Sequence, residues 1–155
     1  MKIGGSYTVP FERQIAYTRL QDPDILARCM PGCDHLDRIG DDEYEMKMKV
    51  AISSVKGLFG GKVRLADQSP PDSFRLLVEG SGKVGFLKGE GLLTLAPGDT
   101  VTEVTYEGDV QVGGMIAGVG QRLLDVTAKL IIKRFFEKFT ATVEEKPAEE
   151  GGEIV

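Results

Sequence analysis

The chain has 155 residues, of which 41% are apolar; this is enough for the packed core of about one domain and too many for a disordered chain. Acidic side chains outnumber basic ones by 24 to 19, and residues 144–155 alone hold five Glu and one Lys, so most of the net charge of −5 lies in this tail. The nearly neutral body argues against a nucleic-acid-binding protein, no apolar segment reaches the ~20 residues of a membrane-spanning helix, and residues 1–5 lack a signal peptide's apolar core.

The first part of the chain predicts one strand and two short helices. Apolar residues alternate over 3–9, which predicts a strand with one buried face. Pro10 ends this strand, and we expect a short helix over 11–20. Asp22 and Pro23 resemble an N-cap followed by a proline at the first helical position, which predicts a second short helix over 24–29.

Six further strands are predicted between residues 33 and 112, where apolar and polar residues alternate. The clearest run is 44–52, in which Tyr44, Met46 and Met48 alternate with charged residues. Short turns rich in Gly, Pro and Asp separate the runs. Neighbouring strands should therefore be antiparallel, because parallel neighbours need long crossover connections.

The apolar period changes from 2 to about 3.6 near residue 115, which predicts one long helix over 115–140. The stripe that we expect this helix to bury consists of Ile116, Val119, Leu123, Val126 and Leu130. Its packing partner would be the concave face of a curved sheet. The expected fold class is thus α+β: a curved seven-stranded antiparallel sheet around a long C-terminal helix, with two short helices after the first strand. This domain would cover 1–143, followed by a disordered acidic tail over 144–155.

A sheet that grips a helix encloses a space with two apolar walls, where a lipophilic ligand can bind. The alternative is that bulky side chains fill this space. Inward-facing glycines favour a cavity because they add no side chain, although they also permit strand curvature. The expected lining residues are Tyr7, Met46, Met48, Phe59, Phe74, Leu76, Phe86, Leu93 and Tyr106 from the sheet, and Ile116, Val119 and Leu123 from the helix. Phe59 and Phe86 lie among glycines, where an aromatic ring can gate a mouth.

Several short motifs point to chemistry that the rest of the sequence does not support. Cys29, Cys33 and His35 lie close together, but the chain has no second ligand pair for a structural zinc site, so we expect neither a metal nor a disulfide. Residues 80–85 match G-x-G-x-x-G, but they lead into a strand rather than a helix, which argues against a dinucleotide site. With one His and no nucleophile elbow, we expect no catalytic residue.

The predicted long helix is basic, with five cations against two acids over 115–140. Cations near its C-terminus suit the helix dipole, which accounts for much of this charge. The alternative is a basic face that meets anionic lipid headgroups or an acidic partner. Gly114 and Gly118 have the spacing of close-packed helices, and we expect them to let the start of the helix approach the sheet.

Three ordered sets of residues resemble one known family. The first comprises Asp22-Pro23, the run MPGCDHL at 30–36 and DEY at 42–44; the second is VKGLFGGKV at 55–63 with Pro70-Pro71; the third is GFLKG at 85–89 with VGGMIAGVGQRL at 112–123. Over about residues 1–143 the chain resembles the CoxG family of carbon monoxide dehydrogenase subunits. This family belongs to the START-like helix-grip (SRPBCC) superfamily, so the resemblance implies a lipid-sized cavity.

The resemblance further implies a non-catalytic accessory protein of a molybdenum-containing carbon monoxide dehydrogenase or a related hydroxylase. Such proteins are thought to help the enzyme reach the membrane and to bind a quinone or fatty-acid-like lipid, with no tightly bound cofactor. The hydroxyls of Tyr7, Tyr44 and Tyr106 would then suit a quinone carbonyl. Two other classes stay open: a small cavity enzyme of the same superfamily, and an interaction module with a filled core.

We expect a cytoplasmic protein that docks transiently on the inner face of the membrane. Some family members carry a long C-terminal extension with a hydrophobic anchor, whereas the tail of this chain is short and acidic. The expected docking residues are Lys56, Leu58, Lys62, Lys88, Met115 and Arg122. The alternative is that these lysines form a solvated rim and that a protein partner provides the docking.

Overall fold

The structure is a computed structural model that describes residues 1–52 and 54–142. The strands are β1 (Lys2–Val9), β2 (Cys33–Gly40), β3 (Glu43–Ile52), β4 (Val55–Ser69), β5 (Ser73–Gly82), β6 (Gly85–Pro97) and β7 (Thr102–Gly113). The helices are α1 (Arg13–Arg19), α2 (Pro23–Cys29) and α3 (Gln121–Ala141), with a 3₁₀ segment, η1 (Met115–Val119), before α3. The expected acidic tail at 144–155 lies outside the described residues.

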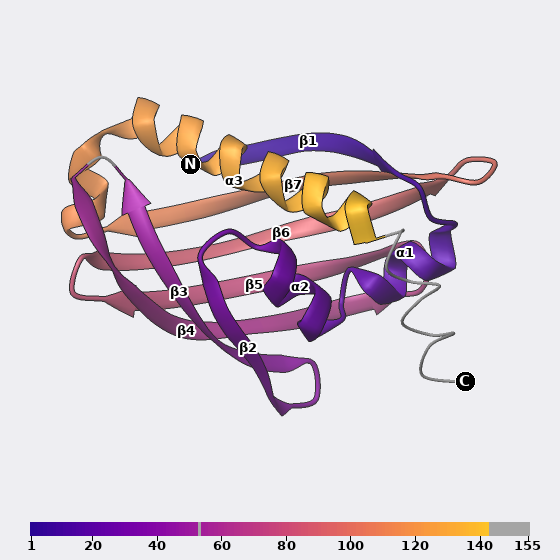
Figure 1. The fold of residues 1–155 in the computed structure, drawn as a ribbon, viewed down its shortest axis with the longest axis horizontal. Coiled ribbons are helices and arrows are strands. Elements are labelled where there is room, and N and C mark those ends of the chain that lie inside the picture. Colours follow the sequence, from indigo (N-terminus) through magenta and orange to yellow (C-terminus); the bar gives the residue numbers. More distant parts are fainter. Residues whose placement is uncertain (53, 143–155) are drawn as a thin grey trace.

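The seven strands form one antiparallel sheet in the order β1-β7-β6-β5-β4-β3-β2. The sheet curves around α3, which lies across its concave side, while α1 and α2 close one end (Figure 1). The expected α+β class, the antiparallel order and the two short helices after the first strand are confirmed. Because β1 and β2 are the two edges, the sheet stays open, and α3 packs between α2 and β1 to cover the opening.

The predicted capping of α2 is present. The Asp22 carboxylate accepts hydrogen bonds from the backbone amides of Asp24 at 2.9 Å and Ile25 at 3.4 Å, and Pro23 starts the helix. These bonds satisfy amide groups that have no partner within the helix. The cap fixes the direction of α2 so that Ile25 and Cys29 are buried.

The expectation of one continuous helix over 115–140 is wrong at its beginning. Gly114 and Gly120 have φ angles of 82° and 99°, and η1 lies between them. A left-handed residue cannot continue an α-helix, so α3 begins only after Gly120. Gly120 thus separates two segments that the apolar spacing alone would join into a single stripe.

The buried stripe of α3 is therefore not the expected one. Leu123, Val126 and Leu130 are 36%, 55% and 42% exposed. The side chains that α3 buries are Leu124, Phe135, Phe136 and Phe139. The prediction counted the helical spacing from Ile116 and Val119 through Gly120 into α3. Because the helix does not continue through Gly120, this spacing selected the wrong face of α3.

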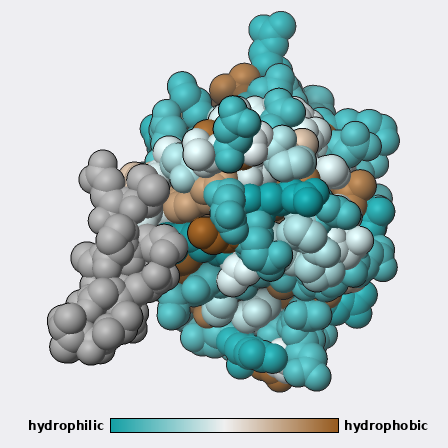
Figure 2. Space-filling model, turned by 90° about the vertical axis from the view of Figure 1, so that its right-hand side faces the viewer, coloured by the Kyte–Doolittle hydropathy of each residue, from teal (hydrophilic) through white to brown (hydrophobic). Residues whose placement is uncertain are grey.

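The core consists of two clusters at opposite ends of the strands. The α1-end cluster contains aromatic residues from α1 and the segment before it, and from β3, β5 and α3. These are Phe11, Tyr17, Tyr44, Phe74, Phe135, Phe136 and Phe139. The η1-end cluster is smaller and consists of Ile52, Phe59, Val84, Ile116 and Leu124. Seen from the end where α1 lies, the surface is mainly hydrophilic (Figure 2).

A buried cation lies where α1 meets the end of α3. Arg19 is only 7% exposed; its guanidinium lies 5.0 Å from the centre of the Phe11 ring and donates a hydrogen bond of 3.4 Å to the Thr142 carbonyl. A cation at a helix C-terminus is favoured by the helix dipole. Arg19 therefore joins α1 to the end of α3.

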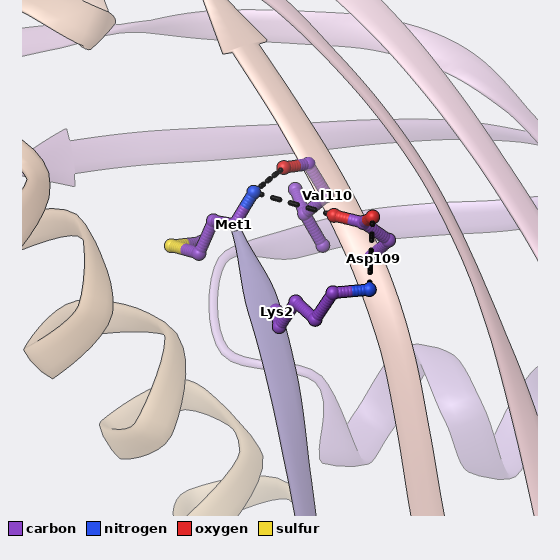
Figure 3. Close-up of polar contacts among 4 residues, drawn as sticks. All are labelled: Met1, Lys2, Asp109 and Val110. Carbon is purple, nitrogen blue, oxygen red and sulfur yellow. Dashed lines mark hydrogen bonds and ion pairs between the residues drawn. The ribbon is translucent and has the colours of Figure 1, made fainter.

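Polar contacts hold the start of β1 against β7 (Figure 3). The Met1 amino group donates hydrogen bonds to Asp109 Oδ1 at 3.3 Å and to the Val110 carbonyl at 2.8 Å, and Lys2 Nζ lies 3.7 Å from Asp109 Oδ2. The hydrogen bond from the amino group lowers the pKa of the Asp109 carboxyl. Because Asp109 is about half exposed, we expect this ion pair to set the register of β1 more than the stability of the fold.

The close approach of β4 to β5 can be tested with two adjacent glycines. A Cβ on Gly61 would collide with the backbone carbonyl of Glu79, whereas a Cβ on Gly60 would meet nothing within 4 Å. We expect Gly61→Ala to lower the free energy of unfolding by about 1–3 kcal/mol or more. Gly60→Ala, the matched control, should leave it unchanged or raise it by up to ~1 kcal/mol. Urea denaturation measures both, and equal effects would contradict the described contact.

Candidate functional site: the concave face of the sheet

The sheet register aligns inward-facing positions into rows across the concave face. Phe74, Leu93 and Tyr106 lie side by side on β5, β6 and β7, and Gly5 of β1 continues the row. The next row places Leu76 beside Gly91 and Gly108. The second row therefore presents much less side-chain volume toward α3 than the first, which holds three large side chains.

Glycines recur at other inward positions of the same region. Gly61 pairs with Gly80 across β4 and β5, and Gly89 pairs with Val78 across β5 and β6. Val78, Leu76 and Leu93 face inward but are only partly buried. These glycines reduce the side-chain volume of the region, whereas Leu76, Val78 and Leu93 pack against the α1-end cluster. The cavity expected from the sequence stays a prediction.

Three aromatic rings connect α3 to the sheet within this region. Phe136 of α3 stacks on Tyr7 of β1, with 4.5 Å between ring centres, and Tyr106 of β7 lies 6.4 Å from both rings. A Cβ on Gly5 would lie 2.8 Å from the Tyr106 hydroxyl, so the absence of a side chain there makes room for the phenol. Tyr7 and Tyr106 therefore hold their rings in place through stacking and leave their hydroxyls for other contacts.

Tyr7 and Tyr106 bring two phenol groups to this part of the interior, and the buried Tyr44 of β3 is a third in the same cluster. Neither the Tyr7 nor the Tyr106 hydroxyl forms a hydrogen bond with another described residue, and neither oxygen is fully buried. Burial raises the pKa of Tyr106 above its ordinary value of 10.0, and the neighbouring Tyr7 raises it further. Tyr106 is therefore protonated at neutral pH and can donate a hydrogen bond to a carbonyl.

Most of the predicted lining residues lie in or against the two core clusters. The α1-end cluster includes or contacts Tyr7, Met46, Met48, Phe74, Leu76, Leu93 and Tyr106. The η1-end cluster includes or contacts Phe59, Ile116 and Val119. The alternation along each strand selects most of the sheet residues of this set, and the neighbouring glycines select Phe59.

Two predicted lining residues lie elsewhere. Phe86 is 49% exposed, and its ring covers Gly113 on the outer face of the sheet, because β6 turns Leu87 and Gly89 inward instead. Leu123 is on the solvent side of α3. Sequence reasoning also missed Phe136, although the closely spaced Phe135, Phe136 and Phe139 were the signal that could have identified the buried face of α3.

The predicted docking residues do not form one surface. Leu58, Lys62 and Lys88 lie on the outer face of the sheet, on the other side from α3, together with Lys56. Met115 and Arg122 lie on η1 and α3. Lys62 and Lys88 instead border a hollow of about 530 Å³ on the outer face. Glu79 of β5 pairs with Lys62 on β4 and with Lys88 on β6, so it lies between the two lysines.

The cysteines and the histidine lie outside the concave region. Cys29 is buried on α2, and His35 Nδ1 lies 2.7 Å from Asp37 Oδ2 on β2. Burial raises the pKa of the Cys33 thiol, and Asp34 raises it further, so Cys33 is a weak nucleophile at neutral pH. Within residues 1–52 and 54–142, no group of three His, Cys, Asp or Glu side chains is placed to hold a metal ion.

The profile of one protein family, the CoxG subunit of carbon monoxide dehydrogenase, matches residues 5–144. The chain belongs to the CoxG family. A conserved protein from Geobacillus kaustophilus has a similar structure, with 36% sequence identity, 94% of this chain and 96% of that chain covered, and a TM-score of 0.89. Among curated proteins, none matches the chain.

More distant structures share the fold of this CoxG-family chain. A START superfamily protein from Mycobacterium smegmatis has 14% identity and a TM-score of 0.68, with 93% of this chain and 97% of that chain covered. The di-domain ARO/CYC protein BexL has 12% identity and a TM-score of 0.65, with 93% of this chain but 46% of that chain covered. The START-like fold implied by the family resemblance is therefore confirmed.

The environment of Tyr106 can be tested by alkaline titration. The chain has four tyrosines, and Tyr106→Phe keeps the stacked ring while removing one phenol. The transition that this substitution removes from the absorbance titration should have its midpoint above pH 10.0. Because the folded state disfavours the phenolate, the wild-type protein should also lose stability more steeply than Tyr106→Phe above that pH. A removed transition at or below the ordinary value would contradict the buried position.

Proposed function

We propose that this protein is the ligand-binding accessory subunit of a molybdenum-containing carbon monoxide dehydrogenase or related hydroxylase, and that its ligand is a quinone or a fatty-acid-like lipid. The family supports the association with carbon monoxide dehydrogenase. The single observation that carries the ligand proposal is the pair of stacked phenols, Tyr7 and Tyr106, whose hydroxyls form no hydrogen bond with another described residue and which lie among mainly apolar side chains.

The chemistry of this interior favours a lipophilic ligand with a polar head. Leu76, Val78 and Leu93 offer apolar contact area that is only partly covered by the protein itself. The Tyr7 and Tyr106 hydroxyls form no hydrogen bond with another described residue, so a ligand carbonyl oxygen that reached them would gain hydrogen bonds worth about 0.5–1.5 kcal/mol each. A quinone combines an apolar ring with such a carbonyl oxygen.

The same arrangement favours binding over catalysis. General acid–base chemistry at neutral pH needs groups that titrate near neutrality, such as a histidine or a perturbed carboxyl group. His35 lies on β2, outside the region of the stacked rings, and the raised pKa of Tyr106 keeps its proton in place. The ligand is accordingly carried unchanged, and the protein is not an enzyme.

Reversible contact with a membrane follows from the proposed ligand. A quinone or fatty acid is held in the bilayer, so a protein that collects it must visit the lipid surface. None of the helices in residues 1–52 and 54–142 is long and apolar enough to cross a membrane. Contact through the surface of the folded domain would therefore serve this step.

Ligand binding can be tested with two tryptophan substitutions at neighbouring positions. Leu93 faces inward beside Phe74 and Tyr106, whereas Leu92 faces outward on the same strand. The chain has no native tryptophan, so each variant also carries a single tryptophan whose fluorescence can be followed. We expect Leu93→Trp to weaken binding of a short-chain quinone at least tenfold because the indole occupies the ligand's space, and Leu92→Trp to leave it within about twofold. Calorimetric titration measures both, and equal affinities would contradict this placement.

The role of the phenols can be tested separately. Tyr7→Phe combined with Tyr106→Phe should weaken quinone binding by about tenfold, since two hydrogen bonds are lost. The affinity for an alkylnaphthalene without carbonyl oxygens should not change. If solvent extraction of the wild-type protein yields no lipid and no quinone binds, the protein is an interaction module with a filled core. Conversion of the added ligand into a new product would show a cavity enzyme.

A further inference from the structure

The solvent side of α3 carries an apolar stripe. Leu123, Val126 and Leu130 recur at spacings of three and four residues, so they share one helix face, and Val126 and Leu130 are 55% and 42% exposed. Met115 of the preceding η1 is 62% exposed. A helix that packs on a sheet ordinarily places polar residues on its outer face. This stripe is therefore unexplained by the packing of the domain.

Cations flank the stripe on both sides. At 100° per residue, Lys129 and Lys133 fall on one side of Val126 and Leu130, and Arg134 and Lys138 fall on the other. All four of these side chains are exposed. Asp125 neutralises Lys129, with which it pairs at 3.1 Å, and Glu137 lies on the stripe side of α3 beyond Leu130. Five cations against two acids still leave α3 with a net positive charge.

We propose that this face of α3, together with Met115, is the surface by which the protein docks on an anionic lipid bilayer, with α3 lying in the plane of the interface. Interfacial helices have this pattern, in which an apolar stripe enters the headgroup region while cations on either side meet anionic headgroups. The proposal deepens the proposed function by naming the surface through which the ligand would be collected, and its test does not require a ligand.

The position of α3 makes this surface suitable for exchange with a bilayer. α3 spans the open side of the sheet (Figure 1), so a membrane in contact with it lies next to the interior of the domain rather than behind the sheet. η1 joins the stripe to the η1-end cluster, where Ile116 is buried and the neighbouring Met115 is not. The outer face with Leu58, Lys62 and Lys88 points the other way and cannot meet the same membrane.

Vesicle co-sedimentation with the full chain can test this assignment. Vesicles of phosphatidylcholine with about one third phosphatidylglycerol should bind the protein, and vesicles of pure phosphatidylcholine should bind it at least tenfold more weakly, because each cation near an anionic surface is worth about fivefold in affinity. Raising the salt concentration should weaken the binding, since the Debye length shortens to about 8 Å at physiological ionic strength.

Four variants distinguish the two candidate surfaces. Val126→Glu with Leu130→Glu, and Lys133→Glu with Arg134→Glu, should each reduce binding to the anionic vesicles at least tenfold. The matched controls, Leu58→Glu and Lys62→Glu with Lys88→Glu, change equally exposed residues of the outer face and should leave binding within about twofold. All of these positions are exposed, so circular dichroism should show an unchanged fold.

A larger loss of binding in the outer-face variants would overturn the assignment to α3. Absence of binding to anionic vesicles at any salt concentration would also overturn it and would favour an acidic protein surface as the occupant. Quinone titration without vesicles tests the proposed function independently. If the protein binds vesicles through α3 but binds no quinone, the docking surface stands and the carrier function is overturned. If it binds quinone but no vesicles, the carrier function stands and the docking surface is overturned.

Discussion

The contact between Phe136 of α3 and the two tyrosines of β1 and β7 determines how the helix is held in the sheet. These rings join the first strand, the last strand and the last helix, and the α1-end cluster continues from them through Phe135 and Phe139. The other end of α3 is held by Leu124 in the smaller η1-end cluster. Because the helix is fixed at both ends, the sheet between them can present glycines without collapsing onto it.

The fold could be predicted from the sequence because its signals are local. Alternation and short turns specify an antiparallel meander, and Asp22 with Pro23 specifies the start of α2. Most sheet residues of the candidate site follow from the same alternation. Phe59 and Phe86 rest instead on their neighbouring glycines, and of these two only Phe59 lies in a core cluster. The pairing of Tyr106 with Gly5 could not be predicted, because it depends on the register between β7 and β1, which are about a hundred residues apart.

The face of α3 could not be predicted for a different physical reason. The helix has apolar residues on both sides, and the positions with the most regular spacing, Leu123, Val126 and Leu130, are the exposed ones. Hydrophobic periodicity identifies a buried face only when the opposite face is polar. Gly120 added a second difficulty. Its positive φ interrupts the helix, so residues on its two sides do not share one helical periodicity, yet the spacing of the apolar residues does not reveal this break. A second apolar face that misleads prediction is also a candidate for a functional surface.

The pairing of β1 with β7 has a consequence for how the chain reaches its native state. Strands β2 to β6 follow one another as hairpins and can form from local contacts, but β1 pairs only with β7, with Lys2 beside Asp109. During synthesis the first strand must therefore wait until nearly the whole chain has been made. Contacts at this sequence separation form slowly, because they require closure of a long loop. The inner face of the meander thus remains uncovered until β7 and α3 arrive, and at this stage the chain is most exposed to aggregation.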